Sequence, residues 1–144
     1  MIFQHTWKLI LEGKKWETRR PVKPGEIAFD HDYHFNVIQC VTTNTGRVKW
    51  EVGKTYAVQP GRGQKAVARR KLLAIRQERL QEMSLDDCAA EGIPQYTFAR
   101  GCLSKTPPDP RWKYIELWNS INTRKGTRWD ENPMVWVLTF EVAI

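Results

Sequence analysis

The spacing of apolar residues predicts three short helices along the chain. In the first, Thr6 stands at the N-cap position and Gly13 follows where a helix commonly ends. In the second, Ser84 and Asp87 fit a capping box. The third is amphipathic, with four apolar residues at helical spacing: Trp112, Ile115, Trp118 and Ile121. The predicted helices cover residues 6–12, 84–94 and 111–122.

Other apolar runs have the β-branched and aromatic content of strands. The last run is apolar on both faces, so we expect it near the middle of a sheet. Residues 66–83 are ambiguous, because their propensity favours a helix while partial alternation permits a strand. Pro21 and Pro24 are expected to interrupt regular structure, and residues 95–110 to form a loop. The strands are predicted at residues 35–41, 47–52, 55–59 and 134–142.

The order of these elements is helix, several strands, two helices and a final strand. This order indicates an α+β fold, with a small curved sheet or partial barrel and helices packed against it. The chain has 144 residues, which suits a single domain.

Charge and aromatic content point to a polyanionic partner. The 23 basic and 16 acidic residues give a net charge of +7, and the pI is about 9.5. A basic domain of this size favours a nucleic acid or nucleotide ligand, although charge does not specify a fold. Seven tryptophans exceed what a small core needs, so some are candidates for stacking on bases.

Cysteine and histidine usage argues against a disulfide framework and a metal site. Cys40, Cys88 and Cys102 form no CxxC pair, which is typical of a reduced protein. His31 and His34 have an H-x-x-H spacing, but no third ligand is evident, so we expect no metal. We expect no organic cofactor either. The absence of a long apolar run and of a signal peptide favours a cytoplasmic protein with no membrane partner.

The segment "GKKWETRRP" at residues 13–21 concentrates candidate chemistry. Lys15 supplies a charge or, if desolvated, a base. Thr18 supplies a hydroxyl that can attack, and Arg20 a planar fork for a phosphate or a base edge. A solvated basic turn and a ligand-binding loop are both compatible with this composition.

The pattern G-x-K-x-x-T-x-R in this segment resembles the signature of ASCH domains, which belong to the PUA-like superfamily. The later segments "MSLDDCAAEGI", "LWNSIN" and "WDENPMVWVLTFEV" resemble the C-terminal part of bacterial and phage ASCH proteins. The resemblance implies one ASCH domain over residues 1–144, built as a PUA-like small β-barrel with short helices packed at its ends. It also implies that residues 66–81 are at least partly strand.

This family is associated with RNA binding and RNA metabolism. One branch that is similar at the key loop hydrolyses N4-acetylcytidine, and another is described as having ribonuclease activity. The resemblance to the first branch assigns Lys15 as proton acceptor, Thr18 as nucleophile and Glu91 as proton donor. Glu91 could instead be a solvated carboxylate at a helix end. The chain is longer than that compact branch and has "TRRP" where its sequence differs.

The residues expected to bind substrate are Gly13, Trp16, Arg19, Arg20 and Arg69. Trp16 could stack on a base or pack on the rim of the barrel. Arg69 belongs to a basic stretch that is either a phosphate-binding track or a solvated strand. In a strand, Arg69, Lys71 and Arg79 would share one face, and Arg70 and Arg76 the other.

Three functions are compatible with these features. The first is an amidohydrolase acting on an acylated cytidine, the second a module that binds RNA or a modified nucleoside without chemistry, and the third a ribonuclease. In the third, Lys15 and Arg20 would stabilise charge on the phosphoryl group. The natural substrate and the oligomeric state are left open.

Overall fold

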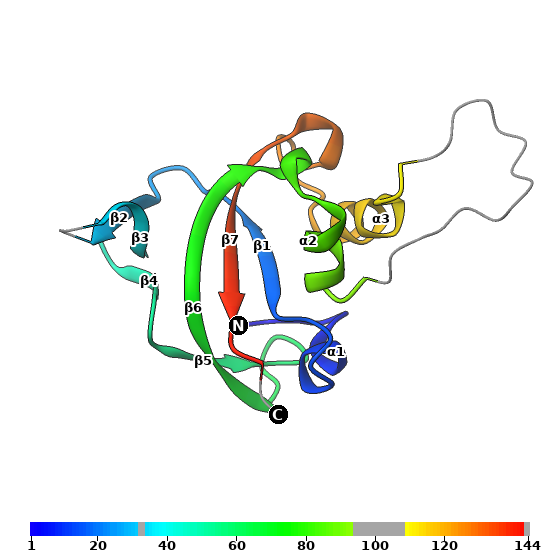
Figure 1. Cartoon of the computed structure of the whole chain (residues 1–144), viewed down its shortest axis with the longest axis horizontal. Helices are drawn as coiled ribbons and strands as arrows, with labels where there is room; N and C mark the ends of the chain where they lie inside the picture. The colour runs from blue at the N-terminus through cyan, green and yellow to red at the C-terminus, as the bar shows by residue number, and fades with distance from the viewer. Residues whose placement is uncertain (32–33, 94–108, 143–144) are drawn as a thin grey trace, which may run out of the picture.

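The computed structural model describes residues 1–31, 34–93 and 109–142 (Figure 1). These residues form seven strands, three α-helices and two 3-10 turns. The strands are β1 (Glu17–Pro21), β2 (Ile27–His31), β3 (His34–Thr42), β4 (Val48–Glu51), β5 (Thr55–Val58), β6 (Ala68–Arg79) and β7 (Met134–Phe140). The helices are α1 (Trp7–Leu11), α2 (Leu85–Ala90) and α3 (Trp112–Ile121), and the 3-10 turns are η1 (Leu80–Glu82) and η2 (Trp129–Glu131). The expected loop at 95–110 lies almost entirely outside the described residues.

The seven strands form one curved antiparallel sheet with the order β1-β7-β6-β3-β2, to which β4 adds on β3 and β5 on β6. Within the described chain the path ends at β1 and β2, so the barrel-like sheet is open rather than closed. The α+β class is confirmed. The central position of the last strand is also confirmed, because β7 lies between β1 and β6.

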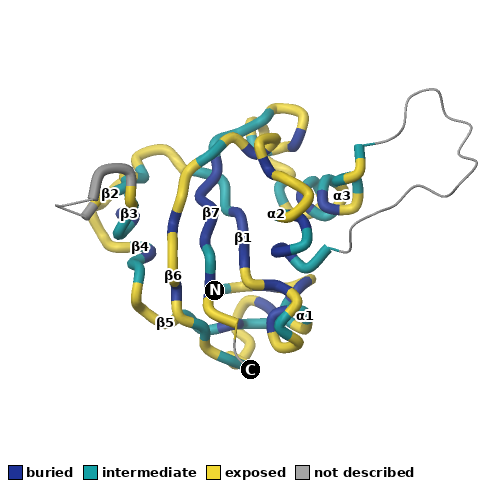
Figure 2. The backbone as a smooth tube through the Cα atoms, viewed as in Figure 1, coloured by how far each residue is buried: buried dark blue, intermediate teal, exposed yellow. Residues whose placement is uncertain are grey.

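The alternating side chains of β7 serve two separate cores, which explains its continuous apolar run. Trp136 and Leu138 pack in a core with α1 and the strands around β6. Val135 and Val137 face the other way, into a core formed with α2 and α3. Figure 2 shows β7 as the most continuously buried strand of the sheet. A strand buried on both faces does not alternate between apolar and polar residues.

Residues 68–79 form the long strand β6, as the family resemblance implies and against their helical propensity. β6 pairs with β7 along most of its length and with β5 on its other edge. A register shift between Leu72 and Ala74 allows both Leu72 and Ile75 to be buried. Hydrogen bonding on two edges outweighs the modest helix propensity of these residues.

The interpretation of residues 13–21 as a turn or loop is wrong for its second half, because Glu17–Pro21 is the edge strand β1. Each of its five residues pairs with a residue of β7. Pro21 lies at the end of β1, where a missing N–H group is tolerated. The sequence also gave no sign of β2, whose register with β3 is irregular.

The two shorter helices begin in different ways. At α2 the predicted capping box is confirmed, since Ser84 Oγ accepts a hydrogen bond from Asp87 N and Asp87 accepts one from Ser84 N. At α1 Thr6 is the N-cap residue, but its side chain makes no capping hydrogen bond.

The third helix, α3, packs on the protein through one face, and its buried residues are Tyr114 and Trp118.

The capping box gives a test of the local structure. We expect Ser84→Ala to lower the free energy of unfolding by about 1 kcal/mol, because the first turn of α2 loses a hydrogen-bond acceptor. Ser84→Gly should cost only a few tenths of a kcal/mol. Urea unfolding followed by tryptophan fluorescence measures both, and equal losses in the two variants would contradict the prediction.

Candidate functional site

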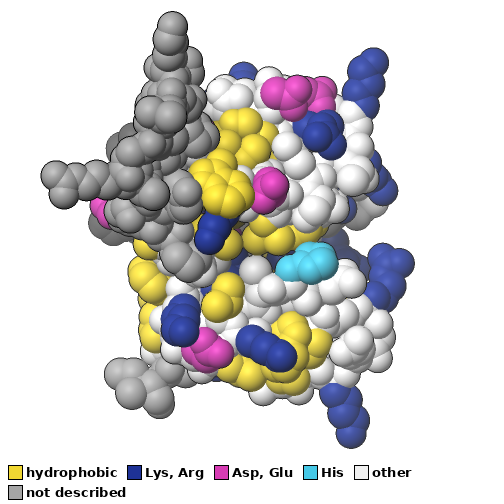
Figure 3. All heavy atoms as spheres, turned by 90° about the vertical axis from the view of Figure 1, so that its right-hand side faces the viewer, with side chains coloured by type: hydrophobic (Ala, Val, Ile, Leu, Met, Phe, Trp, Pro, Cys, Tyr) yellow, Lys and Arg dark blue, Asp and Glu magenta, His cyan; other side chains and the backbone are white. Residues whose placement is uncertain are grey.

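A cavity of about 310 Å³ lies between the N-terminal segment, β1, the end of α2 and α3. Figure 3 looks onto this side of the molecule, where the surface is hollowed between its upper and lower halves. The cavity is mixed in character: His5, Lys15, Arg20, Glu91 and Tyr114 are among its polar lining residues, and Phe3, Leu117 and Ile121 among its apolar ones. Its size is at the lower end of the range for small-molecule sites.

Lys15 and Glu91 form a buried ion pair in this cavity. Their side chains are 4% and 3% exposed, and Lys15 Nζ also donates to the Glu91 carbonyl oxygen at 3.3 Å. The alternative interpretation of Glu91 as a solvated carboxylate at a helix end is therefore excluded. Burial lowers the pKa of Lys15 below its ordinary value, although the Glu91 carboxylate acts in the opposite direction.

Backbone contacts bring these two residues together from distant parts of the sequence. Trp16 N donates to Ala90 O at 2.9 Å, which ties the start of β1 to the end of α2. Gly92 has a φ of +88°, and a Cβ at this position would lie 3.1 Å from the Lys15 Cβ and 2.9 Å from Leu9 Cδ1. A glycine is therefore needed for α2 to end so close to Lys15.

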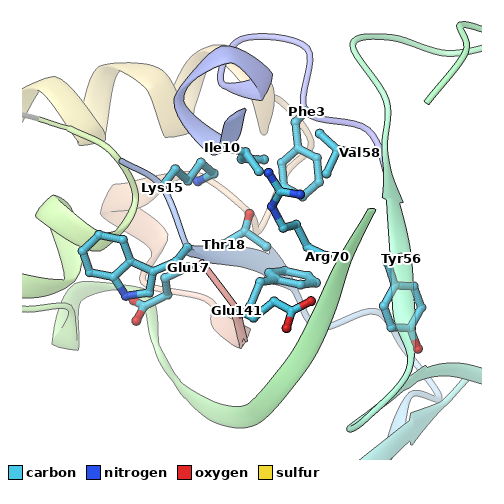
Figure 4. Close-up of a pocket in the computed structure, with 11 residues that line it drawn as sticks. Phe3, Ile10, Lys15, Glu17, Thr18, Tyr56, Val58, Arg70 and Glu141 are labelled. Atoms are coloured by element: carbon cyan, nitrogen blue, oxygen red, sulfur yellow. The ribbon is translucent and has the colours of Figure 1, made fainter. Parts of the chain in front are cut away.

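Thr18 also lines the cavity and is only 5% exposed. Among the residues that the structure describes, none forms a hydrogen bond with its hydroxyl group. In Figure 4 the Lys15 amine and the Thr18 hydroxyl lie at the border of the same pocket. The structure thus brings the three predicted catalytic residues, Lys15, Thr18 and Glu91, to one cavity.

Arg19 faces a cluster of carboxylates and is not available to a substrate. Its side chain is 0% exposed. Its guanidinium contacts four carboxylates: Glu17 at 2.5 Å, Glu78 at 2.8 Å, Asp87 at 3.3 Å and Glu91 at 3.3 Å. Burial alone would lower the pKa of Arg19, but Glu91 and the other acidic groups outweigh it and raise the pKa. The predicted substrate-binding role is therefore replaced by a structural one.

The cluster connects Glu91 to the sheet. Glu91 Oε2 faces Lys15, while Oε1 faces Arg19 and accepts a hydrogen bond from Tyr114 Oη at 3.4 Å. Tyr114 is fully buried, and burial together with the Glu91 charge raises its pKa, so its hydroxyl remains a donor. Sequence analysis missed Tyr114, and helical spacing from Trp118 was the signal that could have placed it on the buried face of α3.

Arg20 lies at the edge of the cavity with part of its guanidinium free. It donates one hydrogen bond to Ile2 O at 2.9 Å and lies over the Phe3 ring at 5.2 Å. No ion pair involves Arg20 in the described part of the chain. Its remaining N–H groups can therefore bind an anionic or carbonyl group of a ligand.

The other predicted binding residues lie farther out. Gly13 ends the α1 turn with a φ of +73°, close to Val142, and does not line the cavity. Trp16 is 37% exposed and lines a smaller pocket beside Thr18. Arg69 is exposed, donates to Thr55 and lines neither space. Its neighbour Arg70, which sequence analysis placed on the opposite face, lines the smaller pocket.

This smaller pocket adjoins the main cavity, with which it shares Phe3, Lys15 and Thr18 (Figure 4). Its volume is about 10 Å³. Apart from the shared residues, its lining includes the apolar Ile10, Val58 and Phe140 and the charged Glu17, Arg70 and Glu141. The site therefore has a main cavity of about 310 Å³ and a small side pocket at the Thr18 hydroxyl.

The described residues include no group of three or more His, Cys, Asp or Glu side chains suited to a metal ion. The side chains of His31 and His34 and the whole of Cys102 lie outside the described part. Cys88 is buried, and burial raises the pKa of its thiol to about 11. In the described parts of the chain, no helix has the length and apolar content needed to cross a membrane.

Solved structures with a similar fold place this open antiparallel sheet in a known class. The chain is similar to the crystal structure of an ASCH domain from Lactobacillus crispatus, with 16% identity and a TM-score of 0.53, over 94% of this chain and 69% of that one. It is also similar to a DUF984 protein from Enterococcus faecalis, with 11% identity and a TM-score of 0.56, over 97% of this chain and 71% of that one.

The protein therefore has the fold of an ASCH domain, as its sequence motifs predict. No family model matches the sequence. No curated protein matches it either.

Proposed function

We propose that the cavity binds a cytidine nucleoside or an RNA nucleotide and hydrolyses an acyl group from its N4 amine. One observation carries this proposal: a buried lysine–glutamate pair lies beside a threonine hydroxyl with no protein hydrogen-bond partner among the described residues, in a cavity of about 310 Å³. The family resemblance implies the same three residues and an RNA-related substrate. Arg20 would hold the ribose, a phosphate or the base edge at the cavity mouth.

The pair can supply both a base and an acid. In a desolvated site, a proton can pass from the Lys15 ammonium to Glu91 Oε2, which leaves a neutral amine and a neutral carboxylic acid. Lys15 Nζ then takes the proton of the Thr18 hydroxyl as Thr18 Oγ1 attacks the acyl carbon. Glu91 donates its proton to the departing N4 nitrogen, so that the C–N bond breaks and the free cytidine amine leaves.

The resulting ester on Thr18 is cleaved by water through the same groups. After a second proton transfer from Lys15 to Glu91, Lys15 accepts a proton from the attacking water. Glu91 returns a proton to Thr18 Oγ1 as the ester bond breaks. The carboxylic acid is released, and Lys15, Glu91 and Thr18 regain their starting protonation states.

Turnover of N4-acetylcytidine tests the proposal directly. We expect the wild-type protein to release cytidine, detected by chromatography, and Thr18→Val to abolish release, because the isosteric side chain has no nucleophile. Thr55→Val, on the exposed end of β5, is the matched control and should retain wild-type activity.

The rival functions give different results in the same assays. Binding of intact N4-acetylcytidine without turnover at high protein concentration would identify a binding module. Cleavage of labelled RNA that persists through further purification and disappears in Lys15→Ala would indicate a ribonuclease. Turnover that is unchanged in Thr18→Val would contradict the covalent mechanism.

A further inference from the structure

The side pocket at Thr18 is built for a small apolar group. Its space of about 10 Å³ corresponds to a single water molecule or methyl group. Figure 4 shows Phe3, Ile10 and Val58 close together on one side of Thr18. Phe3 packs edge-on against Phe140, with ring centroids 6.5 Å apart, which fixes one wall.

The side of this space that Phe3, Ile10 and Val58 form favours a methyl group over water. A water molecule needs two or more polar partners to be stable in a cavity and finds none on that side, whereas a methyl group gains contacts with every surrounding carbon atom. The walls are also rigid, since Phe3, Ile10 and Val58 are all buried core residues. A group longer by one methylene would have to displace core side chains.

Besides Lys15, the same pocket contains a second basic group, Arg70, that can face a carbonyl oxygen. Arg70 enters from β6, opposite Tyr56 of β5, and Figure 4 places its guanidinium between Thr18 and Phe3. Its one hydrogen bond is to the neighbouring Arg69 O at 2.9 Å, and no carboxylate of the described residues pairs with it. Donors that remain free beside a nucleophile are suited to an oxygen on which negative charge develops.

We propose that this side pocket is the acyl subsite of the enzyme, with Phe3, Ile10 and Val58 around the acyl methyl group and Arg70 at the acyl oxygen. This inference rests on the proposed function and extends it. It restricts the substrates to acetyl-sized amides and adds Arg70 as a catalytic residue outside the G-x-K-x-x-T-x-R motif.

Acyl-chain preference tests the apolar half of the subsite. With N4-acetyl-, N4-propionyl- and N4-butyrylcytidine, we expect kcat/KM of the wild type to fall about 10- to 200-fold for each added methylene. Ile10→Ala should largely remove this discrimination by enlarging the pocket. Leu11→Ala, on the exposed face of the same helix, should keep it. The assignment of the acyl subsite would be wrong if the wild type showed no preference for the acetyl group over longer chains, or if Ile10→Ala left this preference unchanged.

Arg70→Met tests the polar half, because it keeps an unbranched apolar side chain and removes the guanidinium charge. We expect kcat for N4-acetylcytidine to fall roughly 10²-fold or more with little change in KM, since the charge acts on the transition state. Arg69→Met is the matched control and should behave as wild type. Equal effects of the two substitutions would remove Arg70 from the mechanism.

A binding measurement separates failure of the subsite from failure of the proposed function. In the Thr18→Val background, calorimetry should show N4-acetylcytidine binding more tightly than cytidine, and N4-butyrylcytidine binding more weakly than the acetyl compound. If the wild type hydrolyses nothing but this order holds, the proposed reaction is wrong and the pocket still selects acetyl groups. If N4-acetylcytidine binds no better than cytidine, the subsite itself is wrong.

Discussion

Replacing Arg19 by methionine is expected to lower the free energy of unfolding by about 3–5 kcal/mol, a loss typical of breaking a buried ion pair from one side. Arg19 is fully buried and is the shared partner of Glu17, Glu78, Asp87 and Glu91. Without it, these carboxylates repel one another, and Arg76, which is partly exposed, is the remaining arginine that contacts the cluster. Chemical denaturation at pH 7 measures the loss.

The pH dependence of this loss identifies its cause. The pKa of Asp87 is lowered in the folded protein. Burial alone would raise this pKa, but the hydrogen bond from the Ser84 backbone and the charge of Arg19 together outweigh burial. The stabilising contribution of Asp87 is therefore present above its unfolded pKa and is lost as the pH falls through the folded pKa. In Arg19→Met the carboxylates of the cluster have lost their shared partner, and protonation at low pH removes their mutual repulsion. The difference in the free energy of unfolding between the variant and the wild type should therefore decrease towards about pH 4.

Two further variants control the Arg19 experiment. Arg79→Met removes an exposed arginine of β6 whose contact is a 3.4 Å hydrogen bond to Asn132 O, and it should change stability by no more than about 0.5 kcal/mol. Arg19→Lys keeps the charge but loses the planar fork, so its loss should be intermediate. A loss below about 1 kcal/mol for Arg19→Met, or one independent of pH, would show that the cluster is not the source of stability.

Lys15→Met is expected to reduce kcat/KM for N4-acetylcytidine by roughly 10²- to 10⁴-fold, because the base that activates Thr18 is removed. The adjacent Lys14 pairs with Glu12 at the surface, so Lys14→Met is the matched control and should retain wild-type activity. Glu91→Gln should also lose activity, since an amide cannot donate a proton to the leaving nitrogen. A thermal melt of each variant separates loss of chemistry from loss of folding.

The pH profile of the wild type provides a second readout for Lys15. Burial lowers its pKa from 10.5, so the neutral amine forms at a lower pH than in an exposed lysine. Activity should fall as the pH rises through this lowered pKa, because the pair then loses the proton that Glu91 donates to the leaving nitrogen. Stability, in contrast, should rise with pH between the lowered value and 10.5, because the unfolded chain binds more protons there. Activity that stays constant up to the ordinary lysine pKa would show that the Lys15–Glu91 pair does not supply this proton.

The elements that sequence analysis identified correctly are specified by residues within a short stretch of the sequence. The capping box of Ser84 and Asp87 specifies the start of α2 whatever surrounds it. The apolar run of 134–142 exceeds what a half-exposed strand needs, and this alone indicates burial on both faces. The G-x-K-x-x-T-x-R spacing and the later "CAAEGI" segment point to Lys15, Thr18 and Glu91 through their resemblance to ASCH domains.

That β1 and β6 are strands could be recognised only from the tertiary structure. Residues 17–21 and 68–79 have weak or contrary local preferences, and they are strands because β7 offers hydrogen-bonding partners on both of its edges. Such pairing energy depends on residues more than fifty positions away in the sequence. A pattern within one short window does not contain it.

By itself, the sequence indicated the fold class and the basic charge, and its resemblance to ASCH domains pointed to Lys15, Thr18 and Glu91, which line one cavity. The tertiary structure decided how neighbouring arginines are used: Arg19 is buried among carboxylates while Arg20 is free of ion pairs in the described chain, and Arg70 rather than Arg69 lines the side pocket. The reason is that adjacent side chains in a strand point to opposite faces, so the pairing register fixes their direction. Burial of Glu91 against Lys15 was decided in the same way, by the packing of α2 onto the start of β1.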